Sequence, residues 1–153
     1  MTLTLQAVDS QVSVAGQLQP SDMAEIAALG FGAVVNNRPD GEAMFGQPRT
    51  ADLKSAAEQA GLVFLDLPFS GPNARPDQVQ ALAGLLAQRD RRVVAFCKSG
   101  MRSALLWAAA EMSVGRGLAE VLSAARHAGQ MLDPAGEIIA GLAASARQLQ
   151  ERG

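Results

Sequence analysis

Residues 93–103 read VVAFCKSGMRS, an apolar run that leads directly into a polar turn containing cysteine, glycine and arginine. A short apolar run bounded by such a turn is typical of a strand buried on both faces. A strongly helical stretch, residues 104–112, follows at once. The turn therefore joins the end of a buried strand to the start of a helix, which is the repeating unit of a parallel α/β sheet.

The same alternation extends outward along the chain. Strand patterns at 31–35, 62–67 and 93–96 alternate with helical patterns at 22–29, 50–60, 79–86, 104–112, 117–128 and 134–150. Residues 2–8 and 11–14 alternate polar and apolar side chains, which predicts a short hairpin or two edge strands. We predict a single α/β domain over residues 1–153, with a mainly parallel central sheet of about five strands flanked by helices.

Composition narrows the function classes. The 153 residues include 13 basic and 15 acidic side chains, which give a net charge of −2. This charge argues against a generic nucleic-acid-binding surface but is compatible with a local anion site. One cysteine and one histidine are too few to form a zinc site by themselves, and a single cysteine cannot form an internal disulfide. The longest apolar run, 104–110, falls far short of the ~20 residues of a membrane span, and residues 1–7 lack the features of a signal peptide. We therefore expect a cytoplasmic protein with no cofactor or metal and no nucleic-acid or membrane partner.

Three loops follow the carboxyl ends of three predicted strands. They comprise residues 36–42, 68–76 and 97–102. Parallel strands would open all three loops on one edge of the sheet, where open α/β sheets bind their ligands. We therefore expect these loops to face one another around a site.

The loop after residue 96 has the chemistry of an anion cradle. Backbone N–H groups and the helix N-terminus attract negative charge, and Cys97 at the base of the loop supplies a thiol that such surroundings make more acidic than a free one. Gly100 allows a backbone geometry that a Cβ would obstruct, and Arg102 offers a planar fork to an oxyanion. Ser103 is placed to donate a hydrogen bond to the thiolate or to cap the helix. The plainer interpretation is an inert buried cysteine beside a helix.

Two resemblances follow from these residues. The four residues between Cys97 and Arg102 resemble the active loop of rhodanese-type sulfurtransferases. The chain over roughly residues 5–110 resembles the beta-lactamase-hydrolase-like, phosphatase-like family, which is related in fold to dual-specificity phosphatases. This likeness lies in 19–22, 30–31, 35–42 (VNNRPDGE), 47–48, 60–62 and 97–107. It implies a dual-specificity-phosphatase-like α/β fold with Cys97 as a covalent nucleophile, and family members fused to persulfide-handling enzymes imply sulfur chemistry for some.

The chain departs from the phosphatase pattern at three places. Cysteine phosphatases place five residues between Cys and Arg, whereas this chain has four, which predicts a tighter cradle suited to a single sulfur or small anion. Phe96 stands where those enzymes usually have His. Their general acid is an aspartate in the loop that corresponds to 68–76, and that loop contains no acid here.

Asp40 and Glu42 are the replacement acids that the sequence offers. Both follow the strand at 31–35, so their loop should lie on the catalytic edge, and we select Asp40 as the candidate that protonates a leaving oxygen. Pro39-Asp40-Gly41 is also ideal turn chemistry. Arg38 is predicted either to bind a substrate anion or to pair with Glu42.

Three functions remain open at this point. The leading hypothesis is a phosphatase-like hydrolase with Cys97, Arg102 and Asp40 as its catalytic residues and a small anionic substrate. The predicted substrate-binding residues are Arg38, Lys98, Ser99, Gly100, Met101 and Ser103. The alternatives are a rhodanese-type sulfurtransferase that carries a persulfide on Cys97, and a phosphatase-like module that binds an anion without catalysis.

Overall fold

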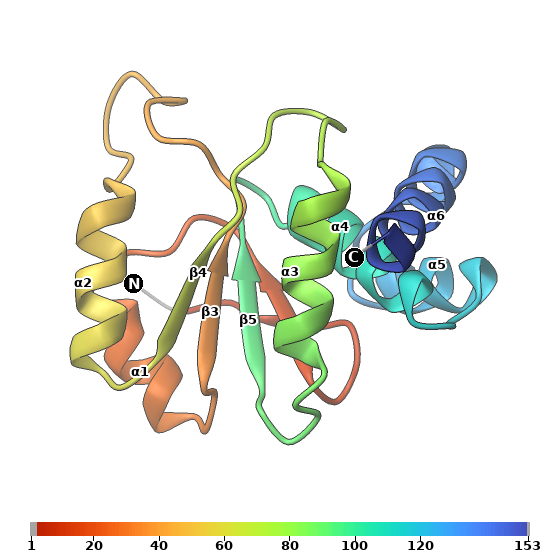
Figure 1. Cartoon of the computed structure of the whole chain (residues 1–153). Helices are drawn as coiled ribbons and strands as arrows, with labels where there is room; N and C mark the ends of the chain where they lie inside the picture. The colour runs from red at the N-terminus through yellow and green to blue at the C-terminus, as the bar shows by residue number, and fades with distance from the viewer. Residues whose placement is uncertain (1–2, 153) are drawn as a thin grey trace.

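The computed structural model describes residues 3–152 and contains a five-stranded sheet (Figure 1). The strands are β1 (Gln6–Ala7), β2 (Val12–Ala15), β3 (Ala33–Asn36), β4 (Val63–Asp66) and β5 (Val93–Phe96). Their order is β1-β2-β5-β3-β4, and only β1 runs antiparallel to its neighbour. The predicted mainly parallel sheet is therefore confirmed. Residue 2 of the first predicted strand lies outside the described residues.

Helices cover both faces of the sheet. On one face lie α1 (Asp22–Ala28) and α2 (Thr50–Gln59), and on the other lie α3 (Pro76–Leu86) and α4 (Met101–Ser113) (Figure 1). The 3-10 helix η1 (Asp133–Ala135) and helices α5 (Leu118–His127) and α6 (Gly136–Arg152) follow in the chain. Helices α5 and α6 pack on the outer side of α4, away from the sheet (Figure 1). Every helical pattern predicted from the sequence is present.

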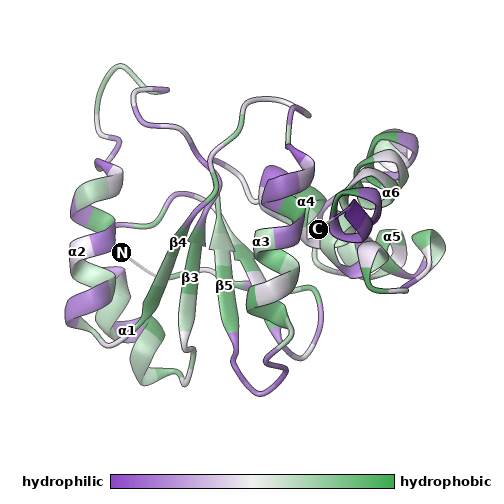
Figure 2. Cartoon of the chain, in the orientation of Figure 1, coloured by the Kyte–Doolittle hydropathy of each residue, from purple (hydrophilic) through white to green (hydrophobic). Residues whose placement is uncertain are grey.

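The central strands β3 and β5 are buried along their whole length, which explains why all their residues except Asn36 are apolar (Figure 2). Successive side chains of a strand point to opposite faces, so each strand feeds two cores. The core beneath α3 and α4 contains Ala33, Val35, Val93 and Ala95, and the core beneath α1 and α2 contains Val34, Val94 and Phe96. Two apolar layers thus fix the register of the strands that carry the site.

The N-terminal hairpin is present, but of its two strands only β1 lies at an edge of the sheet. Strand β2 lies between β1 and β5, pairs with β5 in parallel, and is buried at all four of its residues. Its alternating pattern suggested an edge because Gln11 and Ser13 are polar. Both are nevertheless buried, and the Gln11 amide donates to the carbonyls of Leu86, Gln88 and Arg91.

The three predicted loops emerge at the same edge. Each follows the carboxyl end of β3, β4 or β5 and leads into α2, α3 or α4, and the two longer loops rise together above the sheet in Figure 1. Among residues 3–152, no helix is long and apolar enough to cross a bilayer, and no group of three or more His, Cys, Asp or Glu side chains could hold a metal ion.

Trp107 on α4 is fully buried, and its Nε1 is the one buried side-chain nitrogen or oxygen in the described chain that has no hydrogen-bond partner. We expect Trp107→Ala to lower the free energy of unfolding by about 3–5 kcal/mol because it leaves a large cavity. Trp107→Phe should cost clearly less, since it removes the unpaired N–H while retaining a ring. Urea unfolding of both variants measures this, and equal losses would contradict the prediction.

Candidate active site

Cys97 lies at the end of β5 with 1% of its surface exposed. The N–H of Gly100 donates a hydrogen bond to the Cys97 sulfur at 3.1 Å, and the Cys97 N–H donates to the Ala15 carbonyl at 3.2 Å. The loop thus turns back on its own cysteine and is tied to the end of β2.

Two glycines permit this turn. Gly100 precedes the first residue of α4 with φ of +93°, a conformation that residues with a Cβ rarely adopt. Gly16, at the end of β2, packs against the loop so closely that a Cβ there would lie 3.0 Å from the Lys98 carbonyl oxygen. Gly16 thus allows the end of β2 to lie directly against the loop, and the tighter cradle expected from the short Cys-to-Arg spacing stays a prediction.

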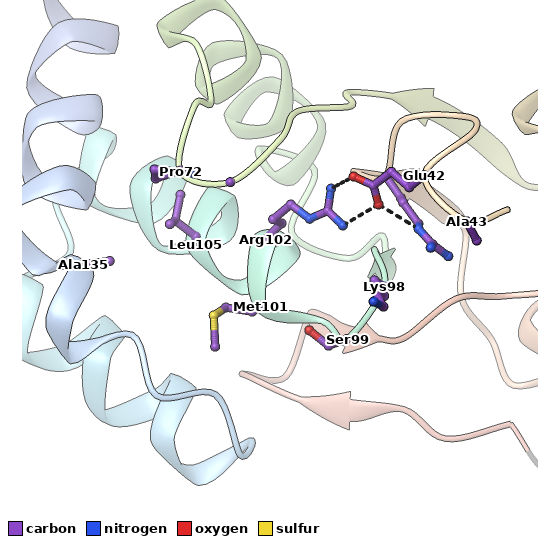
Figure 3. Close-up of a pocket in the computed structure, with 11 residues that line it drawn as sticks. Glu42, Ala43, Pro72, Lys98, Ser99, Met101, Arg102, Leu105 and Ala135 are labelled. Atoms are coloured by element: carbon purple, nitrogen blue, oxygen red, sulfur yellow. Dashed lines mark hydrogen bonds and ion pairs between the residues drawn. The ribbon is translucent and has the colours of Figure 1, made fainter. Parts of the chain in front are cut away.

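Arg102 joins all three loops. It lies in the first turn of α4, and its Nη1 donates to Glu42 Oε2 at 2.8 Å and to the Phe69 carbonyl at 2.9 Å. Its Nη2 donates to Glu42 Oε1 at 2.9 Å, which completes a two-point pair (Figure 3). The expectation that the three loops face one another is confirmed through this one side chain.

Glu42 is held by a second arginine. Arg38, which is 6% exposed, donates from Nε to Glu42 Oε1 at 2.9 Å and from Nη1 to Gln17 Oε1 at 2.9 Å. Of the two roles predicted for Arg38, the structure shows the pair with Glu42.

The charges set the protonation states of this group. The hydrogen bond from Arg102, more than that from Arg38, lowers the pKa of Glu42 to about 2, against burial that raises it. The hydrogen bond with Glu42 in turn raises the pKa of Arg102, and the charge on Cys97 adds to this effect. Glu42 is therefore a carboxylate at neutral pH and holds no proton to donate to a leaving group.

Asp40 lies in the predicted turn, with Gly41 at φ of +76°, but its carboxylate points to α2. Its Oδ1 accepts hydrogen bonds from the Thr50 backbone N–H at 2.9 Å and from the Thr50 hydroxyl at 2.8 Å. These bonds satisfy the start of a helix. Asp40 is not among the residues that line the pocket described below, and its role as a general acid stays a prediction.

Ser103 bonds to neither predicted partner. It is fully buried on α4, and its hydroxyl donates to Asn37 Oδ1 at 2.7 Å, whose amide donates to the Leu67 carbonyl at 3.0 Å. The Asn37 N–H donates to the Phe96 carbonyl at 2.9 Å. Asn37 therefore ties α4 to the ends of β4 and β5. The only sign of this role in the sequence is the pair of asparagines directly after a predicted strand, and no role was predicted for Asn37.

A pocket of about 770 Å³ opens above the loop (Figure 3). Its polar wall consists of Arg38, Glu42, Lys98, Ser99 and Arg102. Its remaining wall consists of Ala43, Gly71, Pro72, Met101, Leu105 and Ala135. Four predicted binding residues (Arg38, Lys98, Ser99 and Met101) and the predicted catalytic Arg102 thus line it, whereas Cys97, Gly100 and Ser103 are buried and do not.

A known protein family matches most of this chain. The family described as beta-lactamase hydrolase-like protein, phosphatase-like domain, matches residues 4–114. A beta-lactamase hydrolase-like protein of Agrobacterium fabrum is 35% identical over 109 residues, which make up 71% of this chain and 25% of that protein. One from Xylella fastidiosa is 30% identical over 121 residues, 79% of this chain and 28% of that protein. The chain thus spans about a quarter of the length of these curated relatives.

Solved structures of phosphatases superpose on this chain. A candidate phosphatase of Neisseria meningitidis superposes with a TM-score of 0.75 at 30% identity, covering 90% of this chain and 96% of that one. A kinase associated phosphatase, crystallised with its catalytic-site cysteine replaced by serine, superposes with a TM-score of 0.73 at 12% identity, covering 95% of each chain.

These comparisons confirm the resemblance seen in the sequence and the predicted α/β fold related to dual-specificity phosphatases. The matched residues include the cysteine loop, Arg102 and the Glu42 loop that holds it. The chain belongs to the family of beta-lactamase hydrolase-like proteins, phosphatase-like domain.

Proposed function

We propose that the protein is a cysteine-dependent phosphatase that acts on a small phosphate monoester. The Cys97 thiolate attacks phosphorus, the bond to the ester oxygen breaks, and the phosphoryl group becomes bound to sulfur. The ester oxygen leaves as an alkoxide or phenoxide, which takes up a proton from water. Water then attacks this cysteinyl phosphate, releasing inorganic phosphate and restoring the thiolate. The observation that carries the proposal is the Gly100 N–H directed at the Cys97 sulfur beside an arginine in the first turn of α4.

The pocket supplies the charge that a phosphoryl group requires. Arg102, Arg38 and Lys98 stand against a single carboxylate, Glu42, so the polar wall is net cationic. The fork of Arg102 is pre-oriented by Glu42 and the Phe69 carbonyl, and preorganised donors stabilise developing negative charge most effectively.

The apolar wall indicates the other half of the substrate. Pro72, Leu105 and Ala135 lie together at one end of the pocket, away from Glu42 and Lys98 (Figure 3). A phosphate fills only part of a space of about 770 Å³. An apolar, preferably aromatic, ester group fits the remainder, and an aryl leaving group departs readily without a proton donor.

The two alternative functions, sulfur transfer and anion binding without catalysis, predict different results in activity assays. Sulfur transfer through a Cys97 persulfide draws on the four-residue loop spacing and gains no support from the comparisons. An anion-binding module without catalysis would bind phosphate but would hydrolyse no phosphate ester and transfer no sulfur.

We expect Cys97→Ser to reduce hydrolysis of an aryl phosphate by about 10³-fold or more, because a hydroxyl lacks the nucleophilicity of the thiolate. Arg102→Lys should lower kcat/KM by about 10²–10³-fold, since a point charge replaces the planar fork. Steady-state kinetics measure both.

Turnover that survives Cys97→Ser would refute the cysteine mechanism. Parallel assays with thiosulfate and cyanide test the alternative, since Cys97-dependent thiocyanate formation without phosphate release would establish sulfur transfer instead.

Glu42→Gln should make stability less dependent on pH in acid. The pKa of Glu42 is about 2 in the folded protein and 4.5 ordinarily, so its ion pairs contribute stability above pH 4.5 that is lost as the pH falls toward 2. The variant lacks this component, so its urea midpoint should change less than that of the wild type between those pH values. Glu120→Gln, which removes a more exposed pair with Arg116, is the matched control and should leave the pH dependence near that of the wild type.

Binding of phosphonates tests the apolar wall independently of catalysis. We expect benzylphosphonate to bind at least about tenfold more tightly than methylphosphonate, because burial contributes ~0.8 kcal/mol per methylene-sized group. Ala135→Asp should abolish this preference, whereas Ala140→Asp, at another half-buried alanine that does not line the pocket, should retain it. Isothermal titration calorimetry gives the Kd values. An equal preference for benzylphosphonate in both variants would contradict the assignment of Ala135 to the apolar wall.

A further inference from the structure

The peptide between Ser99 and Gly100 is hydrogen-bonded at both ends. Its N–H donates to the Cys97 sulfur at 3.1 Å, and its carbonyl accepts from Gln130 Nε2 at 3.1 Å. A peptide unit is planar, and in the trans form its N–H and C=O point in opposite directions. A side chain that fixes the direction of the carbonyl therefore also fixes the direction of the N–H.

Gln130 is itself rigidly held. It follows α5, where Gly129 adopts φ of +84°, its N–H donates to Arg126 O at 2.9 Å, and the Gln130 N–H donates to Ala125 O at 2.8 Å. This is the Schellman pattern that ends many helices, and it fixes the backbone from which the Gln130 side chain extends. Gln130 is a buried residue with 6% of its surface exposed.

The contact with the loop is close. A Cβ added at Gly100 would lie 2.8 Å from Gln130 Nε2, which leaves no room for a side chain between them. Gly100 therefore serves two purposes, the positive φ of the turn and the approach of the glutamine. Gln130 lies outside the residues 4–114 matched by the family.

We propose that Gln130 is a positioning residue, which orients the Ser99–Gly100 peptide so that its N–H stabilises the Cys97 thiolate. This inference rests on the thiolate role of Cys97 in the proposed function. It adds a contribution from the α5–η1 connection, a segment far from the cysteine in the chain. Without the amide donor, the peptide is free to rotate its N–H away from sulfur.

The experiment is a pH titration of thiolate absorbance in the ultraviolet. The chain contains one cysteine and no tyrosine, so Cys97 is the only side chain whose thiolate or phenolate contributes to this signal. Gln130→Met keeps the length of the side chain and removes the donor. We expect the midpoint to move to higher pH by about one unit, a tenfold change in the thiol–thiolate equilibrium, as for the loss of one hydrogen bond to a charged group.

Gln80→Met is the matched control. Gln80 also donates its side-chain amide to a backbone carbonyl, that of Ala146 at 3.1 Å, but between α3 and α6. Its substitution should leave the midpoint where the wild type has it. Gln130→Leu is the second variant should Gln130→Met fail to fold, as judged by circular dichroism.

The outcomes separate this inference from the proposed function. A folded Gln130 variant with the wild-type midpoint would overturn the positioning role, whether or not the protein hydrolyses phosphate esters. A wild-type midpoint above that of a free thiol, unchanged in the Gln130 variants, would overturn it as well. A shifted midpoint in a protein without phosphatase activity would support the positioning role and reject only the reaction.

Discussion

The guanidinium of Arg102 bonds to two partners that stand 60 and 33 residues away in the chain, the Glu42 carboxylate and the Phe69 carbonyl. These contacts require β5, β3 and β4 to be parallel neighbours, because only then do their following loops meet. The pair with Glu42 is two-pointed and partly shielded, with side chains 16% and 27% exposed, so it is stronger and more directional than an ordinary surface ion pair. The geometry of the pocket therefore depends on the sheet order through one arginine.

This arrangement also explains how a chain of net negative charge forms a pocket with a cationic wall. The protein carries a net charge of −2, yet three cationic side chains line the pocket beside one carboxylate. That carboxylate is committed to the arginines and stays ionised far below neutral pH. It orients the guanidinium of Arg102 and holds no proton at neutral pH, so in the proposed function its task is positioning and not acid catalysis. The other candidate acid, Asp40, is bound to Thr50.

Periodicity predicted the fold well because the hydrophobic cores are simple. Strands such as Val93–Phe96 are buried on both faces, and their helices begin and end at proline and glycine signals. The burial of β2 was not predicted, because Gln11 satisfies three carbonyls that no local pattern reveals. In the site, the motif predicted Cys97, Gly100 and Arg102, which are close in sequence. The sequence offered both Asp40 and Glu42 as acids, and the direction of each carboxylate depends on distant partners. Asn37 and Gln130 act through tertiary contacts and leave no signature at that range.

The C-terminal part of the chain contributes more to the site than its position suggests. The family match ends at residue 114, before α5, and a domain reduced to those residues would retain the cysteine, the arginine and the sheet. It would lose Ala135 from the apolar wall and Gln130 from the back of the cysteine loop. Both come from the connection between α5 and α6. Its Leu132 belongs to the same apolar core as Val121 and Ala125 of α5 and Ile139 of α6. The outer helices therefore hold in place two residues of the pocket and of the cysteine loop, Ala135 and Gln130, that lie beyond the matched family region.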